Sequence, residues 1–274
     1  MTFIKNGGAY IQQQINAAEK TVTITGNYEI EQTIFLPSDF HLVLDNCHLK
    51  MADDTFCNMF ANRHVYEPGV TDENICIEGR GNVILDGGTY NGLSERNSEK
   101  DGRPHISVNN TILFAGVSGF KITNLHIRNQ RWWAMNFIAC TNGYIGGIDF
   151  LSDATWVDQH GKIQYGLTRD NYEGVRIKNS DGIDIRRGCK NIIIENITGF
   201  TEDDMVAITS LPGKLEARYG KPDGDTDISG IPEAVEAAKA ADAVILCIGE
   251  PAEYSDEGVC RADLHLPGMQ ETLV

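Results

Sequence analysis

The sequence predicts a mainly β protein built as a solenoid of stacked coils, and two observations carry this prediction. An apolar triplet recurs after 23 residues, since Ile122, Leu125 and Ile127 are matched by Ile145, Ile148 and Phe150. No helical pattern intervenes between these segments, which are punctuated by Gly, Asn and Asp. A repeat of this length, made of strands without helices, is typical of solenoid coils.

Short runs rich in β-branched residues predict further strands. They cover residues 21–25, 32–36, 42–49, 74–78, 82–86 and 189–197. Within the last run, Ile192 and Ile197 repeat part of the apolar triplet. Four asparagines near the expected strand ends could stack as ladders between coils or simply occupy turns: Asn124, Asn142, Asn191 and Asn196.

An amphipathic helix is expected within residues 1–20, where Tyr10, Ile11, Ile15 and Ala18 recur at helical spacing. Such a helix suits a cap over the first coil, which would otherwise expose unpaired backbone groups. The strands of the solenoid are then expected in residues 21–212.

The composition limits the classes of binding partner that the protein is expected to have. The net charge of −16 argues against nucleic acid, and no apolar run suits a membrane span. The first residues lack the apolar core of a secretory signal, and the seven cysteines form no C-x-x-C pair, which together favour a reducing cytoplasm. An exported protein whose signal has been removed is the alternative. No metal-ligand spacing and no nucleotide-binding loop is found, so no cofactor is expected. Composition does not predict an oligomeric state.

Three carboxylates carry the functional signal. Asp181 lies in the motif Asn-Ser-Asp-Gly-Ile-Asp, and Asp203 and Asp204 follow after about one coil. Glycoside hydrolysis needs one carboxyl group to protonate the leaving oxygen and another to activate water. Because neighbouring side chains on a strand alternate, Asp203 and Asp204 should lie at a bend just before a strand over residues 205–208. A solvated pair in a turn is the alternative, and Asp184 is expected to bond turn amides.

The stretches NSDGIDI, NIIIENITGF and EDDMVAI, in this order, resemble glycoside hydrolase family 28, the polygalacturonase-like enzymes. NICIEGRGNVILDGG and IRNQRWWAMNFIACTNGYIGGI extend the resemblance over residues 6–210. It implies a right-handed parallel β-helix that acts on an oligo- or polysaccharide with inversion. Asp203 would be the general acid, Asp181 and Asp204 would activate water, and Asn179 would shape the site.

Two elements of that family are not found at their expected positions, a Gly-His-Gly turn and an Arg-x-Lys pair. Arg176-Ile177-Lys178 precedes Asn179 instead. Other side chains could contribute to sugar binding: Trp132 or Trp133 by stacking, and His160 from a long insertion. Packing and an ordinary loop position are the alternatives for these three. Arg186, Arg187 and Lys190 are expected to be solvated surface residues.

After Ser210 the pattern changes. A polar segment over residues 213–227 reads as a linker, and residues 232–243 predict a helix before an apolar strand over residues 243–248. The stretch 228–274 resembles the C-terminal α/β sandwich domain of glycoside hydrolase family 3, the β-glucosidase-like enzymes, at GEP, EGVCRAD and LPGMQ. That resemblance places an acid/base on Glu257, which we interpret as a vestige because the nucleophile belongs to a separate barrel domain.

The sequence therefore predicts a β-helix over residues 21–212, without its last coils, joined to an incomplete α/β fragment that is weakly ordered or docked. Three functions are compatible with it. The first is an inverting glycoside hydrolase acting on a plant-type, pectic or related polysaccharide. The second is a carbohydrate-binding β-helix without catalysis, and the third is an inactive composite of two truncated glycosidase modules.

Overall fold

The computed structural model describes residues 2–53, 55–88, 109–130, 133–152, 155–157, 163–165, 181–201, 203–209, 215–219 and 231–240. The chain divides into two compact units, Met1–Thr209 and Ser210–Val274. Each is described by itself below.

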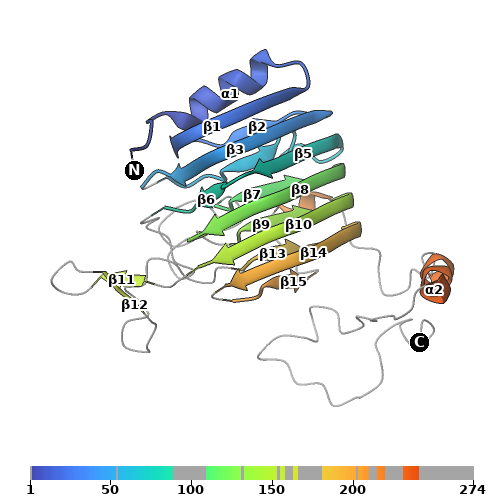
Figure 1. Ribbon diagram of the computed structural model, residues 1–274. Coiled ribbons are helices and arrows are strands. Elements are labelled where there is room, and N and C mark those ends of the chain that lie inside the picture. The colour runs from blue at the N-terminus through green and yellow to red at the C-terminus, as the bar shows by residue number, and fades with distance from the viewer. Residues whose placement is uncertain are drawn as a thin grey trace. The chain divides into compact units, whose positions relative to one another are not determined.

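Two parallel sheets form the first unit, as stacked arrows in Figure 1. One sheet contains long strands: β1 (Thr21–Ile30), β3 (Phe40–Met51), β5 (Asp72–Arg80), β6 (Ile84–Asp86), β8 (Val117–Arg128), β10 (Thr141–Leu151) and β14 (Lys190–Phe200). The other contains short strands: β2 (Ile34–Leu36), β4 (Phe60–Asn62), β7 (Ile112–Ala115), β9 (Met135–Ile138), β13 (Ile183–Ile185) and β15 (Val206–Ile208). Because the chain alternates between the two sheets, each coil adds a strand to both. This is the architecture of a parallel β-helix, and the predicted mainly β solenoid is confirmed.

The register between β8 and β10 is the one that the apolar repeat predicts. Ile145 faces Ile122, Ile148 faces Leu125 and Phe150 faces Ile127. Ile197 of β14 continues this row opposite Ile148. Each strand that the sequence predicts within residues 21–86 is found, although the ends differ by a few residues. The 23-residue interval is therefore the length of one coil.

The core lies between the two sheets. The six side chains of the repeated triplet are 0–1% exposed, and burial of such a side chain stabilises the fold by about 1.5–3 kcal/mol. Phe114, Phe120 and Phe137 add an aromatic cluster, with ring centroids 4.8–6.0 Å apart. In β14 the same inward row is only partly buried, because β14 is the last strand of its sheet.

Helix α1 (Gly7–Ala17) packs on the first coil, as expected for a cap (Figure 1). Ile11 and Ile15 are its buried apolar residues. Gly7 permits the close approach, since a Cβ atom there would lie 2.4 Å from Cβ of Tyr28. Glu31 accepts hydrogen bonds from the N–H groups of Gly8 and Ala9 and so satisfies two donors at the helix start.

The four asparagines singled out in the sequence occupy left-handed bends. Asn124, Asn142, Asn191 and Asn196 have φ between 54° and 58°, a region that Asn tolerates better than most residues. Asn191 also donates through Nδ2 to Oδ1 of Asn142 at 3.4 Å. Both predictions for these asparagines therefore hold. They occupy bends, and Asn142 and Asn191 also form a hydrogen bond between neighbouring coils.

In the first unit, β11 (Thr155–Val157) and β12 (Ile163–Tyr165) form an antiparallel pair. In the second unit, a 3-10 helix (Glu216–Tyr219) and α2 (Ile231–Ala240) are described. Helix α2 corresponds to the helix predicted from residue 232, and the strand expected over residues 243–248 lies outside the described residues. None of the described helices is both long and apolar enough to cross a membrane.

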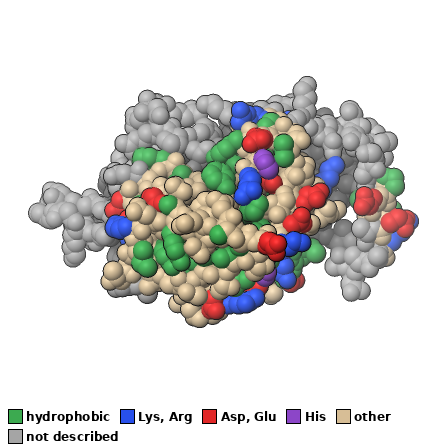
Figure 2. All heavy atoms as spheres, turned by 90° about the horizontal axis from the view of Figure 1, so that it is seen from above, with side chains coloured by type: hydrophobic (Ala, Val, Ile, Leu, Met, Phe, Trp, Pro, Cys, Tyr) green, Lys and Arg blue, Asp and Glu red, His purple; other side chains and the backbone are tan. Residues whose placement is uncertain are grey.

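Charged side chains of both signs lie next to one another on the face seen in Figure 2. An ion pair also joins β8 to β10, where Arg128 Nη2 lies 2.5 Å from Asp149 Oδ2. Some acidic side chains of the β-helix are thus paired with basic ones.

Candidate active site

Asp181 and Asp204 occupy equivalent places on successive coils. Each lies two residues before its strand, and the strands β13 and β15 pair with Ile183 opposite Val206. The N–H of Gly182 donates to the carbonyl oxygen of Asp204 at 2.8 Å. Parallel pairing brings the starts of neighbouring strands to one edge of the sheet, so both carboxylates belong to the same edge.

Gly182 makes this approach possible. A Cβ atom at this position would lie 2.4 Å from the carbonyl oxygen of Met205. Any larger residue would push the Asp181 turn away from the Asp204 turn. The glycine inside the Asn-Ser-Asp-Gly-Ile-Asp motif is therefore a requirement of the site's geometry.

Asp203 lies at a bend before β15, as the alternation argument predicts. Its carbonyl oxygen accepts a hydrogen bond from Oγ1 of Thr201 at 2.8 Å, which fixes the bend. Asp203 and Asp204 are exposed, whereas Asp181 is 6% exposed. The site thus combines one buried carboxyl group with two that solvent and ligands can reach.

Burial and like charges shift the titration of these groups. The pKa of Asp181 is raised to about 7, mainly by burial and also by the charges of Asp203 and Asp204, against the opposing influence of Arg186. Partial desolvation and the charge of Asp204 also raise the pKa of Asp203, although its side chain is open to solvent. A carboxyl group with a raised pKa can hold a proton near neutral pH, which is what a general acid requires.

Asp184 is part of the same cluster. The expectation that it bonds turn amides is wrong, because it lies within β13 and its Oδ2 has no hydrogen-bond partner among the described residues. It is 1% exposed. Desolvation is the main cause that raises the pKa of Asp184 to about 8, and Asp181 adds to it.

The position of Arg186 contradicts a second prediction from the sequence. It was predicted to be a solvated surface residue, but it is 7% exposed, and its guanidinium carbon lies 4.6 Å from the ring centroid of Trp133. The alternation of β13 predicts which face Arg186 shares but not that this face is buried. Asp184 and Arg186 lie two residues apart and share the face opposite the buried Ile183, so a charge on one should influence the other.

Among the other residues proposed from sequence, only Trp133 is described. One face of its ring is occupied by Arg186, which makes it a partner of that side chain. Asn179, Trp132, His160 and Glu257 lie outside the described residues. Within the described ranges, no group of three or more His, Cys, Asp or Glu side chains is arranged to hold a metal ion.

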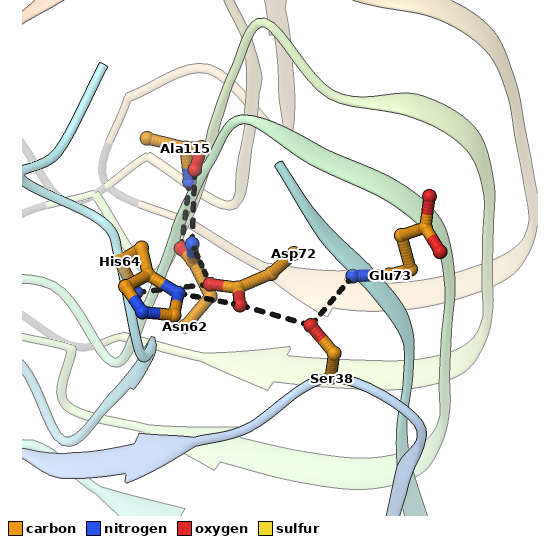
Figure 3. Close-up of polar contacts among 6 residues, drawn as sticks. All are labelled: Ser38, Asn62, His64, Asp72, Glu73 and Ala115. Atoms are coloured by element: carbon orange, nitrogen blue, oxygen red, sulfur yellow. Dashed lines mark hydrogen bonds and ion pairs between the residues drawn. The ribbon is translucent and has the colours of Figure 1, made fainter. Parts of the chain in front are cut away.

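A third buried carboxyl group, that of Asp72, is held near β4, three strands from β13 in the same sheet. Figure 3 shows its contacts. Asp72 is 1% exposed and accepts hydrogen bonds from Ser38 Oγ at 3.0 Å, Asn62 Nδ2 at 2.8 Å and His64 Nδ1 at 2.9 Å. The backbone N–H of His64 also donates to it, at 2.9 Å. With four donors directed at it, Asp72 fastens the turn after β4 to the start of β5.

The fold and the acidic edge define a parallel β-helix of the glycosidase type. Residues 16–221 match the family model described as glycosyl hydrolases family 28, and the chain belongs to this family. The family fold is a right-handed β-helix.

Two curated relatives match over short stretches. A "Beta-glucosidase" from Rhizobium radiobacter is 46% identical over 59 residues, which are 21% of this chain and 7% of the relative. A "Beta-xylosidase" from Formosa agariphila is 51% identical over 45 residues, which are 16% of this chain and 6% of the relative. The matched stretches thus span less than a tenth of either relative.

One solved structure is also similar, described as a "putative glycosyl hydrolase" from Parabacteroides merdae ATCC 43184. The two sequences are 13% identical, and the superposition has a TM-score of 0.42. The aligned region covers 76% of this chain and 88% of the Parabacteroides chain.

Proposed function

We propose that this protein hydrolyses O-glycosidic bonds of a plant-type, pectic or related polysaccharide with inversion at the anomeric carbon. Asp203 protonates the leaving oxygen, and Asp181 and Asp204 activate the attacking water. The observation that carries this proposal is the register of β13 and β15, which brings the turns of Asp181 and Asp204 together.

The division of labour follows from exposure and charge. Asp203 is exposed at its bend, so a sugar oxygen can reach it, and partial desolvation together with the charge of Asp204 favours its protonated form. A base must instead be ionised when it takes a proton from water. Two carboxylates acting on one water share this task, and the Asp204 side chain is open to solvent.

The test is hydrolysis of pectic oligosaccharides by the full chain and by Asp203→Asn. The amide cannot protonate a leaving group, so we expect the rate to fall by about 100-fold or more. Glu19→Gln is the matched control, because Glu19 is also an exposed carboxylate, and it should leave the rate unchanged.

Undiminished hydrolysis in Asp203→Asn would refute the assignment of the acid. Oligosaccharide binding by the unmodified chain without turnover would instead favour a carbohydrate-binding β-helix. A broad thermal transition that no sugar shifts would favour the inactive composite.

We also propose that the short β-xylosidase match, and most of the longer β-glucosidase match, arise from residues 228–274, joined to the β-helix by residues 213–227. The division of the chain near Ser210 supports this proposal. Limited proteolysis should cut within residues 213–227 and leave an intact N-terminal product. Resistance of this segment under conditions that cleave an unfolded control would contradict it.

A further inference from the structure

A polar hollow of about 410 Å³ lies on the sheet of long strands, whereas Asp181 and Asp204 precede strands of the other sheet. This hollow, the β10 groove, is lined by residues of β3, β5, β8, β10 and β14, which follow one another in the sheet (Figure 1). Ile122 points into the core, so its neighbours Lys121 and Thr123 lie on the outer face. The volume of the groove is in the range of small-molecule sites.

Gly146 creates the floor of the β10 groove. It faces Thr123 of β8 on one side and Glu195 of β14 on the other, so a position that carries a side chain on both neighbouring coils carries none here. Tyr144 lies over this space, since a Cβ atom at Gly146 would be 2.6 Å from Tyr144 Oη. Tyr144 Oη also donates to Glu195 Oε1 at 2.6 Å. The tyrosine ring is thus held along the floor by a bond to the next coil.

The charged groups of the groove include one cation without a counter-ion. Glu78 has two basic neighbours, because His41 Nε2 lies 2.8 Å from its Oε2 and Arg80 Nε donates to its Oε1 at 2.8 Å. Lys121 Nζ lies 5.6 Å from the ring centroid of Tyr144 and forms no ion pair with a carboxylate of the described residues. The electrons of the ring attract an ammonium group at this distance. The groove therefore presents a positioned positive charge to an anionic ligand.

The other polar groups of the groove suit a ligand with hydroxyl groups. Thr123 and Asn196 can each donate and accept hydrogen bonds, and the carboxylates of Glu78 and Glu195 have further acceptor sites. These two glutamates disfavour a multiply charged anion such as phosphate, because like charges repel. A ligand with a single carboxylate and several hydroxyls satisfies Lys121 and both glutamates at once.

We propose that the β10 groove binds an acidic sugar, a uronic acid residue whose carboxylate is held by Lys121 Nζ and whose hydroxyls donate to Glu78 and Glu195. This binding site goes beyond the proposed hydrolysis and does not depend on it. It gives an acidic polysaccharide a second contact, on a different sheet from the strands that follow Asp181 and Asp204.

Two ligands that differ only at the sixth carbon test the role of the carboxylate, methyl α-galactosiduronate and methyl α-galactoside. Backbone amide NMR of the full chain, followed at Gly146 and Asn196, measures the affinity of each ligand for the groove. We expect the uronate to shift these amides and to bind about tenfold more tightly than the neutral sugar, because a charge-assisted hydrogen bond contributes roughly that factor.

Lys121→Gln removes the positive charge and should weaken uronate binding about tenfold. Lys50→Gln is the matched control and should leave the affinity unchanged. Lys50 Nζ also lies over an aromatic ring, 5.9 Å from the ring centroid of Phe3, but Lys50 does not line the groove. Sodium acetate, which has the carboxylate without the hydroxyls, should bind more weakly than the uronate.

Equal affinities for the two sugars would overturn the proposal, as would uronate binding that Lys121→Gln leaves unchanged. Acetate binding as tight as that of the uronate would also overturn it, because the groove would then accept any carboxylate. An inactive chain that binds the uronate as expected refutes the proposed function and supports the binding site. An active enzyme without uronate-induced shifts at Gly146 and Asn196 refutes the binding site alone.

Discussion

Asp181 and Asp204 lie at the starts of neighbouring parallel strands and differ in exposure, since Asp181 is buried and Asp204 is open to solvent. Their turns are joined by the hydrogen bond from Gly182 N–H to the Asp204 carbonyl oxygen. These two aspartates, on successive coils, thus have different environments. Such differences separate the titration of neighbouring acids and allow them to take different roles.

The pH dependence of hydrolysis should report Asp181. A group that accepts a proton must be ionised, and burial with two acidic neighbours raises the pKa of Asp181 to about 7. We therefore expect the rate at saturating substrate to fall about tenfold per pH unit below about pH 7. A rate that stays constant from pH 7 down to pH 5 would contradict a role for Asp181 as base.

Gly182→Ala should disrupt the site while the coils remain folded. The added methyl group would lie 2.4 Å from the Met205 carbonyl oxygen, so the two turns must move apart. We expect a loss of about 100-fold in hydrolysis, because small displacements of catalytic groups have large effects on rate. Gly69→Ala is the control, since no atom lies within 4 Å of its Cβ position, although its φ of 102° adds backbone strain.

The Asp72 network should stabilise the fold at neutral pH. Burial by itself would raise the pKa of Asp72, but the hydrogen bonds from His64, Asn62 and Ser38 outweigh it and lower the pKa below 3.8. This contribution to stability is present above about pH 3.8 and is lost as the pH falls through the lower folded-state value.

Asp72→Ala should therefore lower the free energy of unfolding by about 3 kcal/mol at pH 7, because it leaves buried donors unpaired. The neighbouring exposed Glu73 provides the control, and Glu73→Ala should change stability by less than about 0.5 kcal/mol. Urea denaturation at pH 7 measures both variants. Equal effects of the two substitutions would show that the network contributes nothing.

Substitutions of Asn142 should destabilise the fold according to how well the new residue adopts the left-handed bend. Asn142→Ala places a Cβ-bearing residue without a compensating side-chain hydrogen bond at φ 56°, at a cost of about 1–2 kcal/mol. Asn142→Gly loses the hydrogen bond from Asn191 but adopts this φ freely, so it should cost less than the alanine variant. If thermal unfolding shows glycine to be the more destabilising substitution, this prediction is wrong, because the backbone conformation at residue 142 would then not limit stability.

Much of the β-helix could be predicted because its coils repeat. The triplets that begin at Ile122 and Ile145 fixed the coil length, and the structure pairs them residue for residue. The bend before β15 was also predictable, since alternation prevents Asp203 and Asp204 from sharing one face of a strand.

Asp184 and Arg186 were misjudged for a physical reason. Alternation along β13 places both on the face opposite the core, and that face of a strand is commonly solvated. Here it is buried, with Asp184 1% and Arg186 7% exposed. Burial of an outward face depends on contacts formed only in three dimensions, which strand periodicity does not encode.

The stereochemistry of the first product tests the central claim most directly. Proton NMR of a pectic oligosaccharide during the first minutes of hydrolysis, before mutarotation, identifies the anomer that the enzyme releases. A water activated by Asp181 and Asp204 attacks opposite the leaving group protonated by Asp203, so the account predicts the inverted anomer. Release of the retained anomer would require a covalent glycosyl-enzyme intermediate and would contradict the roles assigned to all three carboxylates.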